Sequence, residues 1–388
     1  MALTVTVGDP RMVMDVPAWF PNAMHLKNGD ILVQLVWGSD RHPTQEEFDE
    51  FYAMNTPTTE QDWMAYDARC REQYGLDRVH VLNGRWVRST DGGKTYTETG
   101  LPPVIEYAQL ENGDVVALQW YSYQDSEGRP IIRSWRSHDN CHSWDAPYDI
   151  PLICPPLGKL GSVFPHRRIL HVKDDTFLVL IYGNLVGDEH NRSMVFRTTD
   201  GFRTLHYYST AAMWHPGIGH PQGFNETDFT RTPDGRILCV VRNQGFYPLY
   251  QTESIDDGAT WSAVRQFPGM GVDPSLCTLE NGVVVCGYGR PGVNVAFSEN
   301  NGENWQNITT LMMVGVETNG TVPTAEARPS QSQRSCCYTE LVATGPDQVT
   351  VFYAAPKDWS DLSIRTPWNP QQRQHFRLYA RDIRVERT

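Results

Sequence analysis

The chain has 388 residues and a formal net charge of −13. So acidic a chain argues against nucleic acid and anionic membranes as partners, because both are bound by clustered cations that neutralise phosphates. No apolar run approaches the roughly 18 residues that a membrane helix needs, so no membrane span is expected. With 31 glycines and 26 prolines, the chain should contain many turns and short elements.

The eight cysteines favour buried thiols over a disulfide framework. Cys239, Cys277 and Cys286 stand in apolar, strand-like runs, and Cys336 and Cys337 are adjacent. Neither arrangement has the ligand spacing of a zinc site. We therefore expect no metal and no organic cofactor.

The N-terminus begins with Met-Ala-Leu-Thr-Val-Thr-Val. These residues lack the basic and long apolar regions of a secretory signal. The chain is therefore expected either to be intracellular or to begin after a removed signal. Residues 3–7 are a candidate strand.

One strand-turn-strand pattern recurs six times along the chain. Each copy has an apolar strand, a tight turn and a second strand rich in β-branched residues, and four copies carry Asn-Gly or Asp-Gly at the turn. These dipeptides favour a β-hairpin with a type I′ turn, in which both central residues have positive φ. The copies are residues 25–33, 109–117, 170–178, 231–239, 278–286 and 343–351.

A second turn pattern follows five of the six hairpins. It has Ser or Thr first, Asp or Asn third, usually Gly fifth, and a large apolar residue at the end. The Asp or Asn can accept backbone N–H groups, the glycine supplies a left-handed φ, and the final residue can anchor the turn. These are structural positions rather than catalytic ones. The copies are residues 89–96, 137–144, 198–205, 254–261 and 298–305.

Two successive hairpins make a four-stranded sheet, so the repeats predict six sheets. Sheets closed in a ring bury their faces against one another without exposing long edges. We therefore expect one all-β domain over residues 1–388, a six-bladed β-propeller. The unit around residues 338–387 lacks the second turn pattern and is the expected point of ring closure, with residues 3–7 or 381–386 as its last strand.

The turn pattern that follows five of the six hairpins resembles that of the sialidase (neuraminidase) superfamily. In that family the same motif, the Asp box or BNR repeat, lies between the third and fourth strands of each propeller blade. The resemblance covers nearly the whole chain and implies the propeller fold. Non-sialidase enzymes and binding proteins also carry Asp boxes, so the boxes alone do not determine the function.

Residues 43–80 interrupt the first unit between its second and third strands. Thr44 and Glu47 form a capping-box pattern, and apolar residues recur at helical spacing around Phe48 and Trp63. We expect a short helical insertion near the mouth of the pocket. It would be either a lid that sets substrate choice or a helical decoration that carries a dimer contact.

In a propeller every innermost strand starts at the same mouth of the ring, so residues equally far from each turn should converge. Nine positions before the turn glycine or its equivalent lie Phe20, Val104, His166, Glu226, Asp273 and Tyr338. Seven or eight positions after it lie Trp37, Trp120, Tyr182, Arg242, Arg290 and Tyr353 or Ala354. So many polar groups favour a pocket, while an internal Glu226–Arg242 ion pair would be the purely structural interpretation.

Several of these positions also match sialidase segments. Ser335-Cys-Cys-Tyr338 resembles the segment of the nucleophilic tyrosine, and Phe224-Asn-Glu226 that of the catalytic glutamate. Val241-Arg242-Asn243 and Gly287-Tyr-Gly-Arg290-Pro resemble segments of two substrate-binding arginines. One departure is that Trp19-Phe20-Pro21 stands where the family has Arg-Ile-Pro, so the central arginine of its carboxylate clamp is missing.

Two residues of the first unit are candidates for the remaining roles. Asp40 follows the first hairpin as the family's acidic residue does, and is either the general acid or a solvated loop residue. Arg41 either replaces the missing arginine or lies on the surface. Further candidate substrate contacts are His166, Asp273, Tyr182 and Trp120.

The chemistry predicted from these residues starts at Tyr338. Tyrosine has a free pKa near 10, so it needs a base such as Glu226 to become a nucleophile. A tyrosine suits a sugar whose anomeric carbon bears a carboxylate, because an attacking carboxylate would meet a like charge worth about 4 kcal/mol at ~4 Å. Arg242 and Arg290 would bind that carboxylate by forked hydrogen bonds.

The sequence therefore predicts an exo-acting, retaining glycoside hydrolase of sialidase type, with an acidic glycan as its partner. A second interpretation takes His166 and Tyr338 as the base and acid of a β-elimination at a uronic acid. A non-sialic exo-glycosidase and a non-catalytic glycan-binding propeller are also compatible with these residues.

Overall fold

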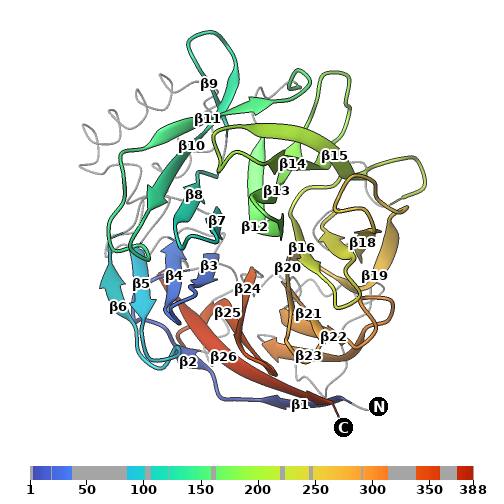
Figure 1. The fold of residues 1–388 in the computed structure, drawn as a ribbon. Coiled ribbons are helices and arrows are strands. Elements are labelled where there is room, and N and C mark those ends of the chain that lie inside the picture. The colour runs from blue at the N-terminus through green and yellow to red at the C-terminus, as the bar shows by residue number, and fades with distance from the viewer. Residues whose placement is uncertain are drawn as a thin grey trace.

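The strands of this protein form a ring of sheets around a central axis (Figure 1). The structure, a computed structural model, describes residues 3–18, 20–36, 85–100, 106–120, 122–158, 163–218, 223–243, 248–289, 292–312, 338–358 and 374–387. No helix occurs in these ranges, and the predicted all-β class is confirmed. The predicted helical insertion at residues 43–80 lies outside them.

The described strands group into antiparallel units of four, and in each unit the first strand lies nearest the axis (Figure 1). The first unit has β3 (Phe20–His25), β4 (Ile31–Val36), β5 (Arg85–Ser89) and β6 (Thr97–Thr99). The second has β7 (Glu106–Gln109), β8 (Val115–Leu118), β10 (Pro130–Ser137) and β11 (Tyr148–Ile153), with the short β9 (Tyr123–Gln124) beside β10. The third has β12 (Phe164–Lys173), β13 (Thr176–Gly183), β14 (Arg192–Thr198) and β15 (Leu205–Met213).

Three further units complete the ring among the described residues. The fourth has β16 (Thr227–Arg231), β17 (Ile237–Val241), β18 (Pro248–Ser254) and β19 (Arg265–Met270). The fifth has β20 (Val272–Thr278), β21 (Val284–Gly289), β22 (Val293–Ser298) and β23 (Gln306–Met312). The sixth has β24 (Thr339–Gly345), β25 (Gln348–Pro356), β26 (Phe376–Arg387) and β1 (Leu3–Val7), with β2 (Arg11–Met12) also on β26. A short parallel pairing of β11 with β15 joins the second and third units into one sheet.

All six predicted hairpins form, as the antiparallel pairs of first and second strands. The predicted type I′ turns, however, are wrong. In the first hairpin Gly29 alone of the Asn-Gly pair has a positive φ, of 91°, and its N–H donates to the Leu26 carbonyl. Asn28 Oδ1 accepts the Asp30 N–H at 3.1 Å, which stabilises a type I turn followed by a left-handed glycine. The same bonds recur at Gly113, Gly235 and Gly282.

The turns of the second pattern join the third and fourth strands in all five units that carry it. After β18, Asp256 accepts the N–H and the hydroxyl of Thr260 at 2.8 and 2.6 Å, and Ser254 Oγ accepts the Gly258 N–H at 2.8 Å. Cys141 and Phe202 take the glycine's place in two other turns, each with a φ of 65° and each fully buried. Packing of these two side chains in the core therefore offsets the cost of the left-handed backbone.

Hydrophobic clusters lie between neighbouring sheets, so each sheet is covered on both faces. Val116 of β8 shares a cluster with Val179 of β13, and Val33 of β4 shares one with Phe352 of β25. Strands with two buried faces are apolar throughout, as β17 and β21 are. Cys239 and Cys286 lie in these strands as buried free thiols, as predicted, and burial raises the pKa of both.

The two ends of the chain meet in the sixth unit. β1 pairs antiparallel with β26, with Val5 opposite Val385, so the N-terminal strand becomes the outermost strand of the last sheet. Both candidate segments for the closing strand thus take part, residues 381–386 within β26 and residues 3–7 as β1. Alternate side chains of β1 are half-buried, and Val5 packs against the cluster between the fifth and sixth units.

We expect Val5→Lys to lower the free energy of unfolding by about 1–3 kcal/mol, because it removes an apolar contact from the strand that closes the ring. Urea denaturation measures the change. Thr4→Lys is the matched control, since Thr4 is exposed on the same strand, and should stay within about 0.5 kcal/mol of the parent. Equal losses in both variants would contradict the role of the half-buried face.

Candidate active site

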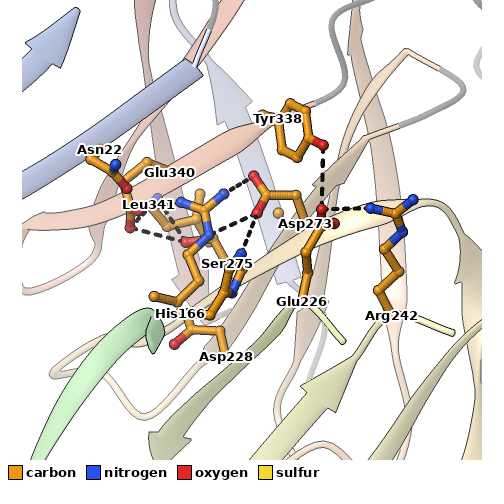
Figure 2. Close-up of polar contacts among 12 residues, drawn as sticks. Asn22, His166, Glu226, Asp228, Arg242, Asp273, Ser275, Tyr338, Glu340 and Leu341 are labelled. Atoms are coloured by element: carbon orange, nitrogen blue, oxygen red, sulfur yellow. Dashed lines mark hydrogen bonds and ion pairs between the residues drawn. The ribbon is translucent and has the colours of Figure 1, made fainter. Parts of the chain in front are cut away.

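Five of the six side chains counted back from the turns belong to described residues, and they lie where the first strands begin. Phe20 opens β3, His166 lies in β12 and Asp273 in β20, while Glu226 and Tyr338 immediately precede β16 and β24. Figure 2 shows Tyr338 directed toward Glu226 and His166 directed toward Asp273, each pair joining different units. The structure therefore brings together residues that are far apart in the sequence.

Tyr338, Glu226 and Arg242 form the polar centre of this mouth. The Tyr338 hydroxyl donates to Glu226 Oε1 at 3.3 Å, and Arg242 Nη1 donates to the same oxygen at 2.5 Å. Tyr338 is 4% exposed and Glu226 9% exposed. The Glu226–Arg242 pair expected under a purely structural interpretation is thus present, and it lies on the carboxylate that also accepts from the tyrosine.

Asp273 supports Glu226 through its backbone rather than through its side chain. Its N–H donates to Glu226 Oε2 at 3.0 Å, so both oxygens of Glu226 accept hydrogen bonds. Asp273 has a φ of 53° and lies in a β-bulge of β20. The carboxylate of Asp273 is fully buried and points away toward β12. The structure therefore gives this predicted substrate contact no exposed surface.

His166 is a buried, neutral histidine with a polar group beside each ring nitrogen. Its Nδ1 accepts the Thr227 N–H at 3.1 Å, and its Nε2 lies 3.3 Å from Asp273 Oδ1. Burial, helped by the neighbouring Arg167, lowers the pKa of His166 to about 4. Since both ring nitrogens are engaged, His166 has none available to take a proton from a substrate.

Arg167 is a site residue that sequence analysis missed. Its Nε donates to Asp273 Oδ1 at 3.0 Å, its Nη2 donates to Asp273 Oδ2, and its Nη1 donates to Glu340 Oε2 at 2.5 Å. In a regular strand it would point away from His166. A bulge between Pro165 and Ile169 shifts the register of β12, and Arg167 has a φ of 66°. The local geometry, which no sequence motif marks, turns this side chain toward the axis.

A second ring of polar residues lies two positions further along each first strand. Because side chains of a strand alternate with period two, the count that gave the first ring also gives this one, and it could have been found from the sequence. Most of these side chains are buried, and Figure 2 labels Asn22, Asp228, Ser275 and Glu340 among them. The ring consists of Asn22, Glu106, Arg168, Asp228, Ser275 and Glu340.

The carboxylates of this second ring are crowded. Both oxygens of Glu106 are buried without a hydrogen-bond partner among the described residues, and burial raises its pKa well above the usual range. Burial also raises the pKa of Asp228 to about 6, although Arg168 opposes the shift. Burial therefore disfavours the ionised form of Glu106, although the nearby Arg167 opposes the shift.

Aromatic side chains line the mouth on two sides. Trp120 contacts Phe164, which stacks on Tyr182, and Tyr182 contacts His166, with ring centroids 5.3 to 5.9 Å apart. Trp120 is 36% exposed, whereas burial raises the pKa of Tyr182. On the other side, Phe20 packs on Tyr338 with centroids 4.4 Å apart.

A cavity of about 380 Å³ opens on the opposite side of the ring. It is lined by residues from the turn ends of first strands, such as His25, Gln109 and Ala343, and its inner end reaches Arg167 and Glu340. The Arg167 ion pairs therefore lie between this cavity and Glu226.

Three predicted site residues, Asp40, Arg41 and Arg290, lie outside the described residues, as does Trp19. Within the described ranges no three His, Cys, Asp or Glu side chains are grouped as a metal site would require. The same ranges contain no helix long and apolar enough to cross a membrane.

The sequence was also compared with known families and proteins. The family model described as a BNR repeat-like domain matches residues 102–346, more than half of the chain. The chain belongs to the BNR repeat-like domain family. No curated protein matches it.

Solved structures share the fold of this BNR repeat-like domain at low identity. A protein of unknown function from Dyadobacter fermentans is 16% identical with a TM-score of 0.66, and the match covers 98% of this chain and 99% of that one. A Hadza microbial sialidase is 14% identical with a TM-score of 0.57, covering 93% and 65%. The α-L-arabinofuranosidase of Fusarium graminearum, in complex with arabinobiose, is 14% identical with a TM-score of 0.58, covering 97% and 98%. These likenesses establish the fold alone.

The buried, neutral His166 predicts a pH dependence of stability. Between pH 6.5 and about 4 the unfolded chain binds a proton at this residue and the folded domain does not, so the free energy of unfolding falls as the pH falls through that window. Between pH 7 and pH 5 we expect His166 to lower the free energy of unfolding of the parent by about 2 kcal/mol. The His166→Gln variant should not show this part of the decrease. Urea titrations at both pH values measure this difference. His142→Gln, in an exposed turn, should keep the parent's dependence, and a His166→Gln variant that also keeps it would contradict the assignment.

Proposed function

We propose that this protein is a retaining glycoside hydrolase that releases a terminal sugar from a glycan. Tyr338 would be the nucleophile and Glu226 its base. The observation that carries this proposal is the hydrogen bond from the Tyr338 hydroxyl to Glu226 Oε1 at 3.3 Å, at the mouth where the first strands begin. A buried tyrosine beside a carboxylate is the arrangement that activates a phenol for attack.

In the proposed reaction the Tyr338 oxygen attacks the anomeric carbon while Glu226 takes the phenolic proton. The bond to the leaving oxygen breaks, and a general acid, for which Asp40 is the sequence candidate, protonates the leaving group. Water then gives a proton to the deprotonated general acid, attacks the same carbon and releases the tyrosine, which regains its proton from Glu226. Two displacements at one carbon retain its configuration. Arg242 and the Asp273 N–H favour the ionised form of Glu226.

We further propose that the substrate is a sugar with a carboxylate at the anomeric carbon, such as sialic acid. A neutral tyrosine avoids the like-charge repulsion that a carboxylate nucleophile would meet there. Arg242 lies at the mouth, and Arg290 is placed there by sequence alone. Together they would supply the forked donors that a carboxylate needs.

A neutral terminal sugar is a second candidate. Trp19 stands where the sialidase resemblance places an arginine, and the ring of the next residue, Phe20, packs on Tyr338 with centroids 4.4 Å apart. An apolar first unit would suit a sugar without a carboxylate. One of the structures with this fold is named an α-L-arabinofuranosidase. The β-elimination interpretation gains no such support, because Nδ1 of His166 accepts from the Thr227 backbone and Nε2 faces Asp273 Oδ1 at 3.3 Å.

Turnover of 4-methylumbelliferyl sialoside and arabinofuranoside by the full chain separates the two candidates. A fluorinated substrate that accumulates the covalent intermediate, followed by peptide mass spectrometry, identifies the nucleophile. Label on Tyr338 supports the first candidate, and label on a carboxylate supports the second. Glycan binding without turnover would support a non-catalytic propeller.

If the sialoside is the substrate that is turned over, Tyr338→Phe and Glu226→Gln should each lower kcat by about 10³-fold, because each removes one half of the activated nucleophile. Initial rates with the fluorogenic glycoside measure this loss. Tyr207→Phe, which removes a hydroxyl bonded to Thr210 on an outer strand, should keep the parent rate. Parent activity in both site variants would refute the Tyr338–Glu226 pair.

A further inference from the structure

Arg167 is the centre of a buried ion-paired layer directly below Glu226. Its side chain is 2% exposed and is bonded to Asp273 through two nitrogens and to Glu340 through a third. Glu340 in turn accepts from Ser275 Oγ at 3.1 Å. Three different units of the ring therefore meet at one guanidinium.

Asp273 depends on Arg167 for its charge. Its carboxylate is fully buried, and the other group within ion-pair distance is His166, which is neutral. A buried carboxylate without a cation is strongly destabilised, and it either becomes protonated or moves toward water. Arg167 therefore fixes both the charge and the position of Asp273.

The position of Asp273 in turn determines the hydrogen bond to Glu226. The donor is the Asp273 backbone N–H, 3.0 Å from Glu226 Oε2. Arg167 and Asp273 both have left-handed backbones, with φ of 66° and 53°. Such conformations cost of order 1–3 kcal/mol in residues other than glycine and persist only where surrounding contacts hold them. The forked bond between the two side chains is such a contact.

We propose that Arg167 is a positioning residue that holds Glu226 in its ionised, correctly oriented form by fixing Asp273. This inference rests on the proposed function, in which Glu226 is the base. Arg167 touches neither Glu226 nor Tyr338 in the described contacts, so it acts through another residue. Because it also lines the inner end of the opposite cavity, it separates Glu226 from water on that side as well.

Several charged or titratable groups face Glu226 and set its pKa together. Removing the Asp273 N–H bond and the nearby cation destabilises the ionised form, so the pKa of Glu226 should rise. The groups are Tyr338 before β24, Arg242 after β17, Tyr182 on β13, His166 and Arg167 on β12, and Asp273 on β20.

Arg167→Lys tests the inference, because lysine keeps the charge but cannot make the forked bond. We expect kcat to fall by about 10- to 100-fold with KM within about threefold, since the base is displaced while the substrate contacts remain. The acidic limb of the kcat/KM profile should move to higher pH. Arg133→Lys is the matched control, because Arg133 makes a forked pair with Asp149 on outer strands, and it should leave the profile unchanged.

A double variant distinguishes the positioning role of Arg167 from a simple loss of stability. Arg167→Met with Asp273→Asn removes both partner charges together, so it should unfold at a higher temperature than Arg167→Met alone. The acidic limb of its kcat/KM pH profile should still lie at higher pH than that of the parent. A parent-like profile in the double variant, or an Arg167→Lys variant that changes only the melting temperature, would overturn the inference.

The pKa of Glu226 can also be read without activity, from the ¹³C carboxyl resonance that Glu226→Gln removes. A higher pKa in Arg167→Lys than in the parent supports the positioning role, and an equal pKa overturns it. If that shift is present while the parent turns over no glycoside, the proposed function fails and the positioning role stands.

Discussion

In a closed ring of sheets the side chains of the innermost strands face one another across the axis, with solvent only at the two mouths. Charged groups placed there must therefore be compensated within the ring. Arg167 compensates Asp273 and Glu340, and Arg242 compensates Glu226. Arg167, Asp273 and Glu340 come from the first strands of three different units, so these charges are balanced only when the ring has closed. The raised pKa values of Glu106 and Asp228 show where burial outweighs the stabilisation that the neighbouring arginines provide.

This requirement divides the axis into layers. The layer at the mouth holds Tyr338, Glu226 and Arg242, the groups suited to chemistry on a ligand. The layer beneath it is buried, and through Arg167 and Asp273 it reaches Glu226 by a backbone N–H rather than by a side chain. Beyond it the ring opens again into the cavity on the turn side. A site at the end of a packed axis therefore has a rigid floor, which is what positioning a nucleophile and its base requires.

How far the sequence predicted the site depends on whether local or long-range geometry placed each residue. Glu226, Asp273, His166 and Tyr338 follow from counting back from the turns, because equivalent positions of the first strands reach the same mouth of the ring. Arg167 does not follow, since the bulge in β12 and its positive φ turn toward the axis a side chain that regular alternation would turn away. The predicted turn type was also wrong, because the Asn side chain accepts the N–H two residues on and stabilises a different turn. Phe20 was visible as a departure, but its contact with Tyr338 exists only in the folded ring.

The sequence by itself determined the repeated unit. Its signals are the hairpin dipeptides, the alternating apolar residues and the five turns that begin with serine or threonine. They are local, because they act on the backbone of neighbouring residues whatever the rest of the fold. Only the tertiary structure decided which charges neutralise one another, that His166 stays neutral, and that Asp273 serves Glu226 through its backbone. The physical reason is that pairing energy and desolvation depend on distances between units that are far apart in the chain, and those distances exist only once the ring has closed.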